Sequence, residues 1–222
     1  MIITIDGPSG TGKSTVARLL AKKLGFSFFD TGAMYRSLVF WLQKEKMNLQ
    51  GNVEWQSYLK NFHFSIEEEL NEKKYFVNGL DVTQEIRKKE VNDAVSAIAA
   101  IKAIRDFFLP IQREYAKNHD SIFEGRDLGT IVFPHAEIKF FLTANAEERG
   151  KRRYLEILSK DPQSSVKLED VIESLKKRDE QDESREIAPL KCPPDAWVLD
   201  TSDCSIDQVI EILFKYTLTK KK

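Results

Sequence analysis

Hydrophobic residues along this chain follow two spacings in turn, one typical of strands and one typical of helices. Residues 1–5 form a short β-branched run, and residues 14–24 then place Val16, Leu20 and Leu24 on one helical face. The alternation continues, with predicted strands at 26–29, 121–124, 138–143 and 196–199 and predicted helices at 33–46, 146–160, 168–185 and from 206. Such alternation is typical of a parallel sheet covered on both faces, so we predict an α/β fold with five core strands.

Two of the predicted helices begin with residues that cap helix N-termini. Asn145 stands three positions before Glu148, and Ser205 stands three positions before Gln208. In such a pair the first side chain accepts a hydrogen bond from an N–H group of the first turn. The pairs therefore predict helix starts next to residues 146 and 206.

Residues 62–86 interrupt the alternation of strands and helices. Phe62, Phe64 and Ile66 alternate with polar residues, and Asn78-Gly79 is typical of a two-residue hairpin turn. We predict a small antiparallel β unit inserted into the α/β chain, followed by a helical stretch from about 88 to 117 that bends at Pro110. Insertions of this kind often cover a ligand or carry specificity.

Composition narrows the class of protein. The 222 residues include 34 Lys plus Arg against 35 Asp plus Glu, so no overall field attracts nucleic acid or a membrane surface. No apolar run approaches the roughly 18 residues of a membrane span. Cys192 and Cys204 have neither metal-site nor disulfide-framework spacing. We expect a cytoplasmic monomer whose partners are small molecules.

Residues 7–14, Gly-Pro-Ser-Gly-Thr-Gly-Lys-Ser, match the phosphate-binding loop G-x-x-x-x-G-K-[ST] between a strand and a helix. Glycines allow the backbone N–H groups to curl round an anion at the helix N-terminus. Lys13 is expected to reach the β- and γ-phosphates, and the Ser14 hydroxyl to bind Mg²⁺. The expected ATP-binding residues are Gly7, Pro8, Ser9, Gly10, Thr11, Gly12, Lys13, Ser14 and Thr15.

Arginines accompany this loop at positions where phosphates could be bound. Arg36 follows the second predicted strand, and Arg126 follows the strand at 121–124. Ligand sites of open α/β sheets lie at such strand ends, and phosphoryl transfer needs several cations around the phosphates. Two predicted helices carry further sets on one face each: Arg149, Arg152 and Arg153, and Arg178, Asp182 and Arg185. From spacing alone, a mobile lid and a solvated, salt-bridged helix face both remain open for these two sets.

Five blocks of this sequence together resemble the bacterial cytidylate kinases, a nucleoside monophosphate kinase family with the P-loop fold. They are Ile-Asp-Gly-Pro-Ser-Gly-Thr-Gly-Lys-Ser-Thr at 5–15, Asp-Thr-Gly-Ala-Met-Tyr-Arg at 30–36, Gly-Arg-Asp-Leu-Gly-Thr-Ile-Val-Phe-Pro at 125–134, Glu-Glu-Arg-Gly-Lys-Arg-Arg at 147–153 and Arg-Glu-Ile-Ala-Pro-Leu at 185–190. The resemblance runs from about residue 2 to 215. The second and third blocks and the β insert are its most specific parts.

The resemblance implies transfer of the γ-phosphoryl group of ATP to CMP or dCMP, with Mg²⁺. It implies a core of residues 1–30, 87–145 and 190–222, an acceptor region at 31–86, and a helical lid at 146–189. It implies acceptor-phosphate contacts from Thr31, Arg36 and Arg126, and cytosine contacts from Ser96, Arg105 and Asp127. Tyr35, Arg178, Asp182 and Arg185 are implied to contact sugar, base and phosphate.

These roles agree with the chemistry of cytosine, which offers an N4 amino donor beside its N3 and O2 acceptors. Asp127 and Ser96 can accept from N4, and Arg105 can donate to N3 or O2. Uracil would present an oxygen to the carboxylate and leave buried groups unpaired, at a cost of about 1–3 kcal/mol or more. The sequence therefore favours cytosine over uracil as the acceptor base.

No general base is required, because the attacking phosphate is already anionic. Catalysis is expected from cations that hold the migrating group (Lys13, Arg149, Arg152 and Arg153) and the acceptor (Arg36 and Arg126). Asp6 and Asp30 could form hydrogen bonds to the ligands of Mg²⁺, although structural roles fit both better.

Two other functions remain open at this point. A kinase for another nucleoside monophosphate, a sugar or a shikimate-like acid would share the loop, but not arginines suited to an acceptor phosphate. A guanine-selective switch would carry Asn-Lys-x-Asp after a late strand, and residues 140–165 hold no such motif. A nucleic-acid motor is disfavoured by the short chain and its balanced charge.

Overall fold

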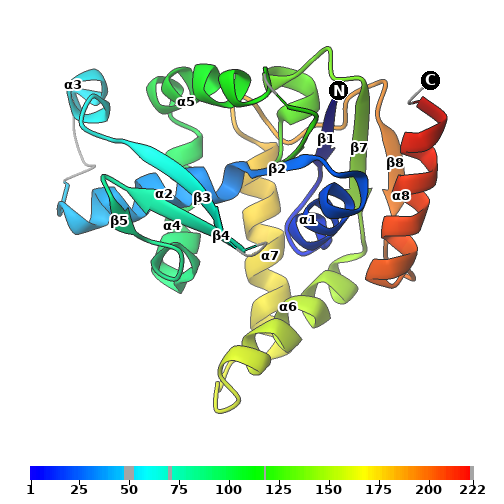
Figure 1. Ribbon diagram of the computed structural model, residues 1–222. Coiled ribbons are helices and arrows are strands. Elements are labelled where there is room, and N and C mark those ends of the chain that lie inside the picture. Colours follow the sequence, from blue (N-terminus) through cyan, green and yellow to red (C-terminus); the bar gives the residue numbers. More distant parts are fainter. Residues whose placement is uncertain (48–52, 70–71, 118, 221–222) are drawn as a thin grey trace. The chain divides into compact units, whose positions relative to one another are not determined.

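The computed structural model describes residues 1–47, 53–69, 72–117 and 119–220. It divides into two compact units, Met1–Phe29 with Arg113–Lys222 (unit 1) and Asp30–Gln112 (unit 2) (Figure 1). Unit 1 is built on a five-stranded parallel sheet in the order β2-β6-β1-β7-β8, as predicted. Its strands are β1 (Ile2–Asp6), β2 (Ser27–Asp30), β6 (Ser121–Glu124), β7 (Ile138–Thr143) and β8 (Trp197–Asp200).

Strands β1, β2, β6 and β7 are largely buried on both faces, whereas the edge strand β8 is partly exposed, and burial on both faces explains why the first four strands are mostly apolar. On one face, Ile3 and Ile5 of β1 pack with Val16 and Leu20 of α1 (Lys13–Leu24) and with α8 (Ile206–Lys220). Helices α1 and α8 lie side by side on that face (Figure 1). On the other face the ring of Phe123 contacts Phe29, Tyr115 and Phe133. Packing of β1 and β6 against buried side chains positions the residues that follow these strands.

Unit 1 also contains two long helices that pack against each other, α6 (Ala146–Lys160) and α7 (Leu168–Glu183). The predicted bounds of β6, β7 and α6 agree with the structure. Both predicted caps are confirmed, since Asn145 accepts from the Glu148 N–H and Ser205 exchanges hydrogen bonds with Gln208. In unit 1 the sequence did not predict a π-helical turn, η2 (Leu128–Val132), which follows β6.

Unit 2 contains the predicted antiparallel insertion. Strands β3 (Phe64–Glu69), β4 (Glu72–Val77) and β5 (Leu80–Asp81) form a separate three-stranded sheet. Asn78 and Gly79 have φ values of 50° and 79°, and positive φ at both central residues is what a tight hairpin turn requires. The hairpin prediction is confirmed. Helices α2 (Thr31–Lys44), α3 (Trp55–Leu59), η1 (Glu85–Arg87) and α4 (Lys89–Ala99) complete the unit with most of α5 (Lys102–Tyr115).

The single helical stretch predicted for 88–117 is wrong, because the structure has two helices there, α4 and α5. Helix α4 ends where Ala100 and Ile101 donate to the carbonyls of Ala97 and Ile98, and these tight bonds close its last turn. Pro110 lies inside α5. Ala100 and Ile101 are acceptable helix residues, so the sequence carries no local signal for the break.

None of the described helices is both long and apolar enough to cross a membrane.

Candidate active site

The candidate active site of unit 1 forms where β1 and β6 end next to each other. Ile5 is paired with Glu124, and the Gly125 N–H donates to the Ile5 carbonyl. The two strands are parallel, so the loop after β1 and the Gly125-Arg126-Asp127 segment after β6 leave the same edge of the sheet. That edge is where open α/β sheets bind ligands.

The loop after β1 has the conformation that its glycines permit. Gly7, Gly10 and Gly12 have φ values of 142°, 80° and 88°. A Cβ at Gly7 would lie 2.1 Å from the Leu142 carbonyl oxygen of β7, so no other residue fits there. Gly12 directly precedes α1, whose first turn carries no acidic residue. The first N–H groups of α1 are thus available to an anion at the positive end of the helix.

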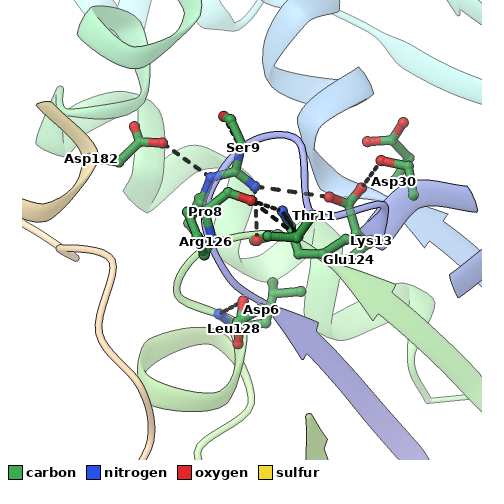
Figure 2. A network of polar contacts seen from close by, with 12 residues as sticks. Asp6, Pro8, Ser9, Thr11, Lys13, Asp30, Glu124, Arg126, Leu128 and Asp182 are labelled. Carbon is green, nitrogen blue, oxygen red and sulfur yellow. Dashed lines mark hydrogen bonds and ion pairs between the residues drawn. The ribbon is translucent and has the colours of Figure 1, made fainter. Parts of the chain in front are cut away.

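Lys13 lies against this loop in a buried position (Figure 2). Its Nζ donates to the Pro8 carbonyl at 2.5 Å and to the Thr11 hydroxyl at 3.4 Å. Burial and the nearby Arg126 charge together lower the pKa of Lys13 to about 7, although Glu124 and Asp179 oppose this shift. The site therefore concentrates positive charge that an anionic ligand would stabilise.

Ser14 and Glu124 place a hydroxyl and a carboxylate beside the loop. The Ser14 Oγ donates to Glu124 Oε2 at 2.9 Å, and Glu124 is buried at the end of β6. Oxygen ligands of this kind fit Mg²⁺, which binds through one or two protein groups together with phosphates and water. No group of three or more His, Cys, Asp or Glu among the described residues could hold a metal ion. Sequence reasoning missed Glu124, although its place just before Gly125 was a usable signal.

Asp6, at the end of β1, has a structural role. Its two carboxylate oxygens accept from the N–H groups of Leu128 at 3.0 Å and Gly129 at 2.8 Å. Burial raises the pKa of Asp6 to about 7 against the lowering effect of these two bonds. Asp6 thereby fixes the first turn of η2 next to the loop. This is the structural role that the sequence favoured for Asp6.

Arg126 joins three parts of unit 1. Its guanidinium donates to Asp182 of α7 at 3.1 Å, to the Ser9 hydroxyl at 2.9 Å and to the Gly125 carbonyl at 3.1 Å (Figure 2). Burial disfavours the charge, but Asp182 and Glu124 outweigh it and raise the pKa of Arg126 above its ordinary value. The guanidinium thus stays charged at the edge of the phosphate loop.

Further predicted residues of unit 1 lie near Arg126. Asp182 is buried, and its carboxylate lies 3.9 Å from the Arg185 guanidinium. The positive charge of Arg178 lowers the pKa of Lys13. Asp127 is buried just before η2, and its negative charge raises the pKa of Asp6. The structure therefore brings together Lys13, Arg126, Asp127, Arg178, Asp182 and Arg185 around the ends of β1 and β6.

The three arginines of α6 have three different environments. Arg149 is buried and donates to the Ser9 carbonyl of the loop at 3.0 Å. Arg152 donates to the Thr201 carbonyl at 2.6 Å, in the segment after β8, whereas Arg153 pairs with Glu156 on the surface at 2.6 Å. The structure places only Arg149 in contact with the loop. Thr201, which sequence reasoning missed, links Arg152 to the loop through a 3.4 Å bond to the Thr11 carbonyl.

The predicted residues of unit 2 form a local arrangement of their own. Asp30 caps α2 by accepting from the Ala33 N–H at 2.7 Å, so α2 begins at Thr31, two residues before the predicted start. The same carboxylate pairs with Arg36 at 3.2 Å. These contacts hold Thr31 and Arg36 in the first turns of α2.

Arg105 links three helices of unit 2. It is buried on α5, its guanidinium lies 5.9 Å from the Tyr35 ring of α2, and it donates to the Ala99 carbonyl of α4 at 3.0 Å. Ser96, also buried, lies one turn before Ala99 on α4. The Tyr35 ring is fixed edge-to-face against Phe108 at 4.9 Å. Unit 2 thus groups a guanidinium, a hydroxyl and an aromatic ring, which are groups that can bind a base.

The chain is similar to known proteins over nearly its whole length. A family model described as cytidylate kinase matches residues 3–219. A cytidylate kinase from Protochlamydia amoebophila is 49% identical over 100% of this chain and 98% of its own length. Cytidylate kinases from Fusobacterium nucleatum and Caldanaerobacter subterraneus are 42% and 40% identical, over 97% and 96% of this chain and 96% and 92% of their own lengths.

Proposed function

The chain belongs to the cytidylate kinase family, and from this premise we propose how its residues transfer the γ-phosphoryl group of ATP to CMP or dCMP. The products are ADP and CDP or dCDP. One observation carries the proposal for unit 1: the phosphate loop with Lys13 and the guanidinium of Arg126 lie at neighbouring strand ends, joined through Ser9. A cation for donor phosphates thus stands beside a second cation, as phosphoryl transfer requires.

On the donor side, we propose that residues 7–15 bind the β- and γ-phosphates of ATP through Lys13 and through backbone N–H groups of the loop. Pro8 has no N–H group and the Ser9 N–H donates to Asp179, so these two residues shape the loop rather than donate to phosphate. Ser14 and Glu124 would hold Mg²⁺, which supplies charge neutralisation at the donor phosphates. Arg149 lies on the loop already and would hold the migrating group with Lys13. Arg152 and Arg153 are proposed to join them from α6 as part of a lid formed by residues 146–189.

On the acceptor side, we propose that Thr31, Arg36 and Arg126 bind the phosphate of CMP. Ser96, Arg105 and Asp127 would read cytosine, and Tyr35, Arg178, Asp182 and Arg185 would complete the contacts to sugar, base and phosphate. The acceptor phosphate attacks as an anion, so these residues orient it and offset charge rather than remove a proton. We further propose a cytoplasmic monomer. The balance of 34 basic and 35 acidic residues argues against a nucleic-acid partner.

The proposal predicts a clear order among acceptors. With ATP as donor, we expect comparable kcat/KM for CMP and dCMP, and a value for UMP that is lower by about 5- to 150-fold, which corresponds to roughly 1–3 kcal/mol for unpaired polar groups. AMP and GMP should be poorer still. Release of ADP, followed in a coupled assay with all five acceptors, measures this order. Activity on AMP or GMP without activity on CMP would overturn the proposed function.

The role given to Glu124 predicts a changed requirement for magnesium. In Glu124→Gln, we expect the Mg²⁺ concentration that gives half-maximal activity to rise about tenfold, because a neutral amide binds a hard cation less well than a carboxylate. Glu173→Gln on the exposed face of α7 is the matched control and should behave as the parent enzyme. Activity of both variants measured against Mg²⁺ concentration tests this. If the Mg²⁺ concentration for half-maximal activity is unchanged in Glu124→Gln, Glu124 is not part of the metal site.

A further inference from the structure

The polar groups of Ser9, in the middle of the phosphate loop, are all bound by side chains from outside the loop. The Ser9 N–H donates to Asp179 Oδ1 at 3.0 Å, and the Ser9 carbonyl accepts from Arg149 at 3.0 Å. The Ser9 hydroxyl accepts from Arg126 at 2.9 Å. Helices α6 and α7 therefore contribute directly to the conformation of the loop.

Arg149 and Asp179 also pair with each other, which closes a ring of hydrogen bonds with the Ser9 backbone. The Arg149 guanidinium also donates to Asp179 Oδ2, and its Nε donates to the Ala144 carbonyl at 3.0 Å. Both side chains are buried, so neither is screened by water. The loop and α6 approach each other closely here, since a Cβ added at Gly10 would lie 3.1 Å from the Arg149 Cβ. A buried pair of this kind, with its hydrogen bonds satisfied, defines one geometry for the groups it binds.

We propose that Asp179 is a positioning residue for the donor nucleotide. It contacts neither nucleotide itself and acts through two groups that do: it fixes the first half of the phosphate loop through the Ser9 N–H, and it holds Arg149 against the Ser9 carbonyl. The proposal rests on the assigned phosphotransferase reaction and adds to it the residue that joins α7 to the loop. Removing its charge is expected to weaken the use of ATP far more than the use of CMP.

The variant Asp179→Asn tests this, with Glu173→Gln as a control for the same chemical change on an exposed position of α7. In Asp179→Asn, we expect the KM for ATP to rise about tenfold, while the KM for CMP stays within about twofold. The reason is that an amide offers one oxygen, to either the Ser9 N–H or the Arg149 guanidinium, and turns its NH2 group toward the other donor. Calorimetric titration with Mg²⁺-ATP in the absence of CMP provides an independent Kd.

A second variant, Asp179→Glu, separates charge from geometry and remains available if Asp179→Asn fails to fold. It keeps the charge, but the KM for ATP should stay raised, since the longer side chain displaces the carboxylate from Ser9. A merely structural role would lower the thermal midpoint and the amount of active enzyme and leave the KM for ATP and the KM for CMP unchanged; that result would overturn the proposal. An inactive parent enzyme would instead contradict the assigned reaction, whatever the variants do.

Discussion

Lys13→Met is expected to lower kcat/KM for phosphoryl transfer by about 10³-fold, or roughly 4 kcal/mol, the loss typical of removing a preorganised charged donor from the transition state. The ammonium is buried beside the loop, where its interaction with phosphate is weakly screened. Methionine keeps the unbranched chain and fills the same space, so the loss reports the charge and not a cavity. The coupled ADP assay and calorimetric titration with Mg²⁺-ATP measure it.

The same change should leave the fold intact. Burial lowers the pKa of Lys13 to about 7, far below its ordinary value, which means that the native state disfavours the charged form. This unfavourable contribution to stability is largest at low pH, where the buried lysine must be protonated, so Lys13→Met should melt at an equal or higher temperature near pH 6.

Lys22→Met, an exposed lysine in the last turn of the same helix, is the matched control and should keep the activity of the parent enzyme. Parent-like activity in Lys13→Met itself would contradict the donor site. A lower melting temperature of that variant near pH 6 would contradict the electrostatic account.

The elements that sequence reasoning predicted best carry signals at both ends. Strand β7 is apolar apart from Lys139 and Thr143, and α6 begins after a capping asparagine. The errors lie where the local pattern carries no signal. Helix α4 ends after Ala99 although the next residues could continue it. The turn of η2 depends on hydrogen bonds to Asp6, which is distant in sequence.

The phosphate loop could be predicted because a single segment contains all its parts. The residues that support it could not be predicted in the same way. Between residues 176 and 183 acids and bases are mixed, and the structure buries Asp179 and Asp182 while it exposes Glu180 and Glu183. Spacing defines a helix face, but only packing selects which face meets the loop. For the same reason, spacing could not predict that Arg149 contacts the loop whereas Arg153 pairs with Glu156 on the surface.

Arg126→Ala is the second change for which we expect a large effect. The guanidinium binds Asp182, the Ser9 hydroxyl and the Gly125 carbonyl from one position, and it is proposed to bind the acceptor phosphate as well. Its loss should lower kcat/KM for CMP by about 10²- to 10³-fold, or roughly 3–4 kcal/mol. Arg126→Lys should recover only part of this loss, because an ammonium cannot reproduce the planar fork of donors.

The fold should survive Arg126→Ala, since Asp182 keeps a second cation, Arg185, at 3.9 Å, and Glu124 keeps its bond from Ser14. Arg18→Ala, an exposed arginine of α1, is the matched control for the same substitution. Circular dichroism and thermal melting establish folding, and initial rates with each substrate varied separately locate the defect. We expect the defect mainly in kcat and in the KM for CMP, because Arg126 acts on the acceptor. Parent-like turnover in Arg126→Ala would exclude this arginine from the acceptor site, and a defect confined to the KM for ATP would assign it to the donor instead.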